Sequence, residues 1–152
     1  MIKEIVTHPD DRLREKSKDV SLGEITTEKF SQLVKDMTET MKKKDGIGLA
    51  APQIGVGKRV AVINSKNGVI IFVNPKVVRK SFLKDIDEEG CLSVPGKYGK
   101  VKRCRKITVR FDDGQGQKNT IVARGLFARV IQHELDHLDG ILFIDKLVKS
   151  KK

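Results

Sequence analysis

The chain has 152 residues, a length that fits one domain around one hydrophobic core. Hydrophobic residues make up 38% of it and occur in compact, regularly placed runs, which excludes a disordered chain. Lys and Arg number 31 against 20 Asp and Glu, and the net charge of +11 indicates either contact with polyanions such as RNA or a solvated basic surface.

No secretion signal is visible in the sequence, and no apolar run approaches the ~20 residues that a membrane span requires. We therefore expect a cytoplasmic protein without membrane contact. The two cysteines, Cys91 and Cys104, are expected to be free or metal-bound, because disulfides are uncommon in such chains. A disulfide between them is the alternative.

A helix is predicted near the beginning of the chain. Thr26 or Thr27 can cap it, and apolar residues recur at three- and four-residue steps up to about Lys44. The following segment 46–55 is rich in small residues and contains a proline, which makes continuation of the helix unfavourable. The backbone of this segment can therefore approach a ligand.

Strands are predicted in the middle of the chain. Residues 59–64 and 69–74 are rich in Val and Ile, and the Asn-Gly pair between them predicts a hairpin. Residues 77–83 are predicted to form another strand, and 105–112 to pair with 118–123.

The segment 89–96 contains glycines and a proline and is expected to be irregular. Helical spacing of apolar residues returns over 125–137. The order of these elements predicts an α+β domain of antiparallel strands packed around helices.

The last predicted helix contains His133-Glu134-Leu135-Asp136-His137. Positions i and i+4 lie ~40° apart around a helix axis, so both histidines can reach one metal ion, and Glu134 can face water bound to it. Cys91 is a candidate third ligand, because a catalytic site commonly has three protein ligands and one open position. The alternative is an amphipathic helix with two ordinary histidines, and a cysteine that is only a small buried hydrophobe.

Three segments together resemble the peptide deformylase family. Residues 46–53 are similar to its GxGLAAPQ element, 89–93 to EGCLS and 132–138 to QHExDHL, in the family's order and spacing. The similarity extends over nearly the whole chain. It implies a single deformylase-like catalytic domain over residues 1–152, in which antiparallel strands pack around a C-terminal metal-binding helix that carries HExxH.

The resemblance implies a metal-dependent hydrolase of protein biosynthesis that removes the formyl group from the N-terminal formylmethionine of new polypeptides and releases formate. Its metal ligands would be Cys91, His133 and His137. The ion would be Fe²⁺ in the cell, and Zn²⁺, Ni²⁺ or Co²⁺ could occupy the same ligands.

Further roles follow from the same resemblance. Glu134 would act as general base and then as general acid. Gln53 and the backbone N–H of Leu92 would form the oxyanion hole, although a single glutamine otherwise more often braces a loop.

The nascent formylmethionyl polypeptide would bind in an extended conformation along the backbone of Ile47 and Gly48. The pocket for its methionine side chain has Ile47, Leu126 and Val130 as candidate residues, and Leu126 is equally a candidate for the core.

The chain departs from the common bacterial pattern in several places. Asp87 and Arg129 stand where many relatives have apolar residues near the pocket mouth, and these two could pair with each other. Tyr98 stands where many relatives have arginine. The chain ends soon after Leu147, whereas many bacterial relatives continue into a longer C-terminal helix linked to ribosome docking. A weak ribosome association through the lysines of residues 149–152 is therefore a hypothesis, and we expect a monomer.

Two other functions fit parts of the sequence. A zinc peptidase also uses HExxH, but such enzymes usually complete their site with His or Glu, whereas this chain offers Cys91. A basic RNA-binding module could hold a structural zinc ion through Cys and His. Three evident ligands and few aromatic residues argue against that module.

Overall fold

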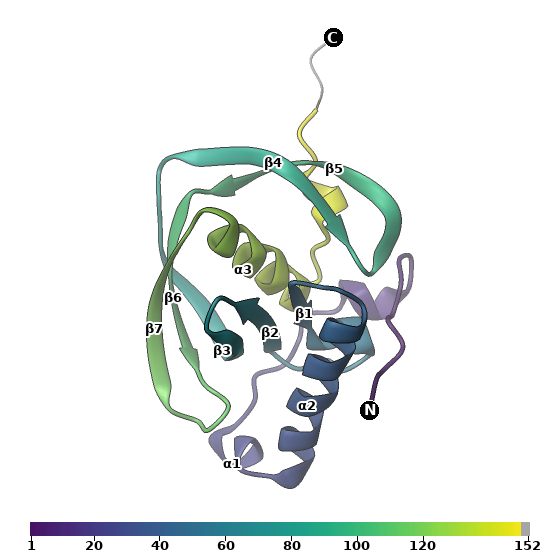
Figure 1. Ribbon diagram of the computed structural model, residues 1–152, viewed down its shortest axis with the longest axis vertical. Helices are drawn as coiled ribbons and strands as arrows, with labels where there is room; N and C mark the ends of the chain where they lie inside the picture. Colours follow the sequence, from purple (N-terminus) through teal and green to yellow (C-terminus); the bar gives the residue numbers. More distant parts are fainter. Residues whose placement is uncertain (150–152) are drawn as a thin grey trace.

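The computed structural model describes residues 1–149, and its longest helix, α2 (Glu28–Lys43), matches the first predicted helix (Figure 1). Thr27 caps it, since the hydroxyl oxygen of Thr27 accepts a hydrogen bond from the backbone N–H of Phe30 at 3.2 Å. Met37 and Met41 lie fully buried on its inner face. Among residues 1–149, no helix has the length and apolar character needed to cross a membrane.

Five strands form one antiparallel sheet in the order β1-β2-β3-β6-β7, and two more form a separate antiparallel hairpin. Their bounds are β1 Gly48–Ala50, β2 Val60–Ser65, β3 Gly68–Lys80, β4 Lys84–Cys91, β5 Val94–Cys104, β6 Lys106–Asp112 and β7 Lys118–Arg124. The predicted hairpins β2-β3 and β6-β7 are confirmed. The remaining short helical elements are η1 Asp11–Arg14, α1 Leu22–Ile25, η2 Ala51–Ile54 and η3 Phe143–Lys146.

The prediction of a separate strand over 77–83 was wrong, because β3 continues without interruption from Gly68 to Lys80. Its first half pairs with β2 and its second half with β6, and the register shifts between Val73 and Lys76. Asn74 has a positive φ of 49° there, and the next residue is a proline, which cannot donate a ladder hydrogen bond. The proline therefore lies in a bulge within one strand, and not between two strands.

The prediction of an irregular segment over 89–96 was also wrong. Residues 89–91 end β4, Val94 begins β5, and Leu92 and Ser93 form the turn between them. Gly90 pairs with Tyr98, and a Cβ at Gly90 would lie 2.6 Å from the Tyr98 ring. The glycine is thus required by a close cross-strand contact, and the many charged residues of this hairpin hide the usual alternation of apolar and polar residues.

Helix α3 (Gly125–Leu138) occupies the centre of the molecule, between the concave face of the five-stranded sheet and the arch formed by β4 and β5 (Figure 1). Its residues Ala128, Ile131 and Leu135 join a core cluster with side chains of β2, β3, β6 and β7. Burial of each such aliphatic side chain larger than alanine stabilises the folded state by ~1.5–3 kcal/mol. The packing holds the inward face of α3 in a fixed orientation toward β1 and the end of β4.

Candidate metal centre

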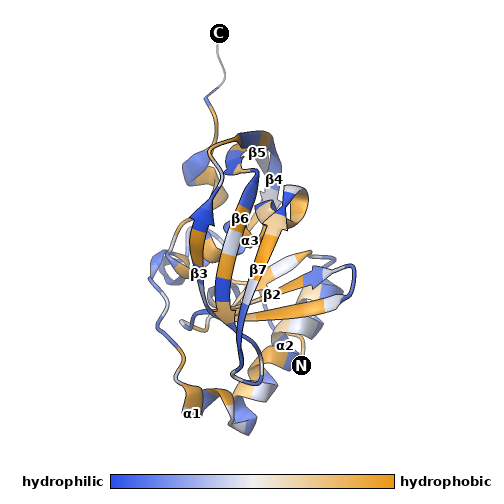
Figure 2. Ribbon diagram, turned by 90° about the vertical axis from the view of Figure 1, so that its left-hand side faces the viewer, coloured by the Kyte–Doolittle hydropathy of each residue, from blue (hydrophilic) through white to orange (hydrophobic). Residues whose placement is uncertain are grey.

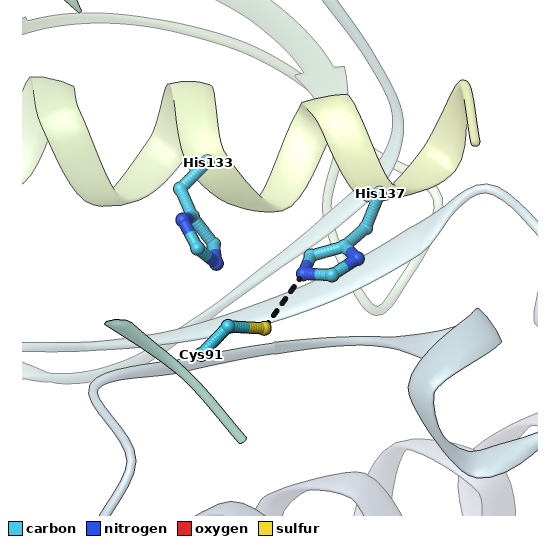
Figure 3. A group of neighbouring side chains, drawn as sticks. All are labelled: Cys91, His133 and His137. Atoms are coloured by element: carbon cyan, nitrogen blue, oxygen red, sulfur yellow. Dashed lines mark hydrogen bonds between the residues drawn. The ribbon is translucent and has the colours of Figure 1, made fainter. Parts of the chain in front are cut away.

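Three potential metal ligands from two separate elements converge beside α3 (Figure 3). His133 and His137 lie one turn apart on α3, and Cys91 is the last residue of β4. Their ligand atoms all lie within 4.8 Å of one another, and Cys91 Sγ is 3.3 Å from His137 Nε2. The structure therefore brings together the three residues that the sequence suggested as ligands.

The donor set fits a divalent first-row ion. Tetrahedral coordination with ordinary metal–sulfur and metal–nitrogen bonds separates the donors by ~3.3–3.6 Å, and a thiolate with two imidazoles suits zinc or iron. Burial lowers the pKa of His137 well below its usual value, which keeps the ring neutral, the form that binds a metal. Burial also lowers the pKa of His133, but Glu134, Cys91 and Glu89 outweigh this and raise it to about 10. The groups around His133 therefore favour a positive charge at this site, such as a proton or a metal ion.

A buried carboxylate, that of Glu89, orients the ring of His133. Its Nδ1 lies 2.9 Å from Glu89 Oε1, so that Nε2 faces Cys91 and His137. The Glu89 carboxylate also accepts two hydrogen bonds of 2.9 Å from Arg103 and one of 2.6 Å from Arg129. Burial raises the pKa of Glu89, but the bonds from His133 and Arg103 outweigh it and hold the pKa well below its usual range. Glu89 is therefore ionised.

The network of ion pairs also includes Asp136 of α3. Arg103 donates to Asp136 Oδ2 at 2.5 Å, and Lys146 Nζ lies 3.0 Å from the same oxygen. We call Glu89, Arg103, Arg129 and Asp136 the arginine cluster. It connects the β4-β5 hairpin to the helix that carries the histidines.

The suggested pairing of Arg129 with Asp87 is wrong. The Arg129 guanidinium is buried and donates to Glu89, to the carbonyl of Val101 at 2.9 Å and to the carbonyl of Asp85 at 2.9 Å. Asp87 is exposed and is not among the hydrogen-bond partners of Arg129.

Glu134 lines the same cleft as His133 and lacks the hydrogen-bond partners that Glu89 has. It is 4% exposed, and its Oε1 has no hydrogen-bond partner among residues 1–149. Burial raises the pKa of Glu134 to about 7, against the lowering effect of His133. Gly48 of β1 makes room for it, because a Cβ at Gly48 would lie 2.8 Å from Glu134 Oε2.

Gln53 is buried beside Cys91 and is held at both ends of its amide. Its Oε1 accepts a hydrogen bond from the backbone N–H of Ala50 at 2.9 Å, and its Nε2 donates to Ser93 Oγ at 3.1 Å. The same Nε2 lies 3.6 Å from Cys91 Sγ. The amide donor therefore points toward the three ligands while the oxygen braces the η2 turn.

These residues lie in a cleft of about 530 Å³. Its lining includes Leu92 and the three suggested pocket residues, Ile47, Leu126 and Val130. Leu126 is 65% exposed, so it is not part of the core. Strand β1 forms an edge of the five-stranded sheet and pairs only with β2 within the described chain, which leaves its other edge facing the cleft.

The roles of Glu89, Arg103 and Arg129 were missed by the sequence reasoning. One signal was available for Glu89, since residues i and i+2 of a strand face the same side and Glu89 precedes Cys91 by two. The two arginines gave no signal, because they come from different elements and are brought to Glu89 only by the packing of β5 and α3.

A thiolate and two imidazoles, with a buried carboxylate beside them in an open cleft, form the kind of site found in metal-dependent hydrolases. The family model described as polypeptide deformylase matches residues 2–152. The chain belongs to this family.

Individual members of the family are similar to this chain over most of their length. The chain is 48% identical to peptide deformylase 2 of Xanthomonas axonopodis pv. citri over 151 residues, covering 97% of this chain and 88% of that protein. It is 49% identical to the peptide deformylase of Halothermothrix orenii over 142 residues, covering 92% and 90%. The actinonin-bound class I type b peptide deformylase of Acinetobacter baumannii superposes with a TM-score of 0.93 at 35% identity, covering 97% and 99%.

Proposed function

We propose that the protein is a hydrolase that removes the formyl group from the N-terminal formylmethionine of new polypeptides and releases formate. The observation that carries the proposal is the convergence of Cys91, His133 and His137 in a cleft beside the unpartnered carboxylate of Glu134, in a chain of this family. The Acinetobacter baumannii enzyme was also solved with Met-Ala-Ser bound, a peptide with methionine at its first position. Residues 1–152 would form one catalytic domain.

Cys91, His133 and His137 would hold one divalent ion, and we propose Fe²⁺ as the ion in the cell. Zn²⁺, Ni²⁺ or Co²⁺ can occupy the same ligands. A bound ion of this kind polarises a carbonyl and lowers the pKa of water, which supplies the nucleophile. The thiolate cancels part of the charge of the ion, so a nearby base is needed to help take the proton.

Glu134 is the residue proposed to move the protons. Its carboxylate would take a proton from the attacking water and give it to the amine nitrogen as the formyl carbon–nitrogen bond breaks. A pKa raised by burial to about 7 suits both steps, because the group then accepts and donates near neutral pH. The closeness of Gly48 to Glu134 limits the positions that the carboxylate can take.

The oxyanion that develops on the formyl group would be stabilised by Gln53 Nε2 and the backbone N–H of Leu92. The bond from Ala50 to Gln53 Oε1 supports this role, because it fixes which end of the amide is the donor. One such donor commonly lowers the barrier by ~3–4 kcal/mol.

The peptide would pair with the free edge of β1 through the backbone of Ile47 and Gly48, and its methionine side chain would contact Ile47, Leu126 and Val130. We also propose a cytoplasmic monomer that associates weakly with ribosomes. Residues 150–152, which include two of the lysines on which the ribosome hypothesis depends, lie outside the described residues.

The test is formate release from a formyl-Met peptide by Ni²⁺-loaded protein, beside Glu134→Ala loaded in the same way. Release by the parent that is lost in the variant, with the metal retained, supports both the reaction and the role of Glu134. Cleavage of an internal peptide bond in the same substrate, without formate release, would instead indicate a peptidase.

A further inference from the structure

Strands β3, β6 and β7 carry a group of cationic side chains on the face of the sheet that points away from α3. Buried residues 107, 109 and 111 of β6 face α3, so residues 106, 108, 110 and 112 face outward. Residues opposite each other in register share a face, which assigns the outward residues of β3 and β7. The outward set contains six cations, which we call the basic sheet face: Lys76, Arg79, Lys106, Arg110, Lys118 and Arg124.

These six side chains are exposed and available. None of them takes part in an ion pair within residues 1–149. The outward set contains a single carboxylate, Asp112, opposite Lys118. Figure 2 looks onto this side of β3, β6 and β7, and no helix lies over it.

The rest of the surface is electrostatically mixed. Exposed lysines of α2, such as Lys29 and Lys35, share the helix with Glu28, Asp36 and Glu39. On the β4-β5 hairpin, Glu88 lies opposite Lys100 in register, and Arg105 pairs with Asp85. The basic sheet face, with six cations and one carboxylate, has a net charge of +5 out of the +11 of the chain.

We infer that the basic sheet face binds the phosphate backbone of RNA. Strand β6 is ~20 Å long at ~3.4 Å per residue, and cations lie on all three neighbouring strands, so the face spans several consecutive phosphates. Thr108 and Thr120 lie among the cations and can donate hydrogen bonds to phosphate oxygens. The outward set contains no aromatic side chain, so bases cannot stack and binding is independent of sequence.

The same features favour RNA over an anionic membrane surface. Within β3, β6 and β7 of the described structure, the exposed large apolar side chains are Val78 and Val122, at 42% and 55%. The more exposed Phe82 and Leu83 follow the end of β3 and are not part of these strands. Membrane-surface segments combine basic residues with large apolar or aromatic side chains that enter the lipid. The inference is independent of the proposed hydrolase activity, because the face lies on the opposite side of the sheet from α3 and the cleft.

The test uses the metal-loaded full chain and a fluorescently labelled 12-nucleotide oligouridylate, with affinity measured by anisotropy across a salt series. One variant carries Lys106→Gln, Arg110→Gln and Arg124→Gln. A matched control carries Lys29→Gln, Lys35→Gln and Lys42→Gln on α2, with the same loss of charge. A third variant, Lys106→Arg with Arg110→Lys and Arg124→Lys, keeps the charge.

We expect the sheet variant to bind at least about tenfold more weakly at low salt, and its plot of log affinity against log salt to be shallower by about 2. The charge-conserving variant should bind like the parent, and the α2 control should change about twofold. Equal weakening by the sheet variant and the α2 control would overturn the inference, as would a parent that fails to bind at low salt. The same variants are also tested with vesicles that contain anionic phospholipid. A sheet variant that loses vesicle binding but keeps RNA binding would also overturn the inference. Formate release by each variant reports separately on the catalytic site.

Discussion

Glu89 and Glu134 are both buried beside His133, but they lie in opposite electrostatic surroundings. Glu89 belongs to the arginine cluster, where Arg103, Arg129 and His133 hydrogen-bond to it. Glu134 faces the cleft, and one of its oxygens has no partner among residues 1–149. Accordingly, the pKa of Glu89 is lowered by its partners, whereas that of Glu134 is raised by burial.

The difference separates two tasks within one site. A carboxylate with four hydrogen bonds stays ionised and holds its neighbours in place, so it stabilises the structure but exchanges no proton near neutral pH. Burial of the Glu134 carboxylate outweighs its attraction to His133, so the two protonation states of Glu134 are close in free energy near neutral pH. We therefore expect substitutions of Glu134 to change activity and substitutions in the arginine cluster to change stability and metal affinity.

The largest effect is expected from Glu134→Gln. Loss of the proton acceptor should lower kcat for formate release by about 10²–10⁴-fold. Stability should be unchanged or slightly increased, because the cost of burying the Glu134 carboxylate is only partly offset by its attraction to His133. Formate assays and urea unfolding of the metal-free protein test both parts. A variant that stays active but unfolds much more easily would reverse the roles of the two glutamates.

Glu89→Gln should have the second largest effect, and on different quantities. The substitution leaves Arg103 and Arg129 without their buried counter-charge, so the free energy of unfolding should fall by about 3–5 kcal/mol. Metal affinity should fall about 10–100-fold, because Nδ1 of His133 loses the carboxylate that orients it. Urea unfolding of the metal-free protein and competition with a chelator measure the two effects. An unchanged unfolding free energy would show that the cluster does not stabilise the fold.

The sequence predicted the parts of this comparison that depend on local spacing. The i, i+4 histidines, Glu134 between them, and the helix from Thr27 to about Lys44 follow from helical periodicity. The arginine cluster does not, because Glu89, Arg103 and Arg129 lie on three elements whose packing no local pattern encodes. The β4-β5 hairpin was missed for a related reason. A glycine at a close cross-strand contact and many charged residues occupy positions where an apolar alternation would have indicated the strands.

Arg129→Met should have a smaller effect within the arginine cluster. Methionine keeps an unbranched chain lining the cleft but loses the hydrogen bonds to Glu89 and to the carbonyls of Asp85 and Val101. We expect a loss of about 1–3 kcal/mol in unfolding free energy, less than for Glu89→Gln, because Arg103 still neutralises the carboxylate. Lys97→Met, at an exposed position of the same cleft, is the control and should change stability by less than about 0.5 kcal/mol. Equal losses from both variants would mean that burial of the arginine is unimportant.

Gly48→Ala tests whether Glu134 needs the space that glycine leaves beside it, and it should have the smallest effect. The new Cβ would lie 2.8 Å from Glu134 Oε2 and 2.9 Å from its Cγ, so the glutamate side chain must shift. A displaced base is less well aligned with the water, and we expect kcat to fall about tenfold with a smaller change in KM. Gly57→Ala is the control, since a Cβ there meets no atom within 4 Å.

Glu134→Asp shows whether the contact with Glu134 is the cause of the loss, because its shorter side chain relieves that contact. If Gly48 acts by leaving room for Glu134, adding Gly48→Ala to Glu134→Asp should cost little further activity. Fully additive losses would instead show that the alanine disturbs another function of β1, such as its backbone pairing with the peptide.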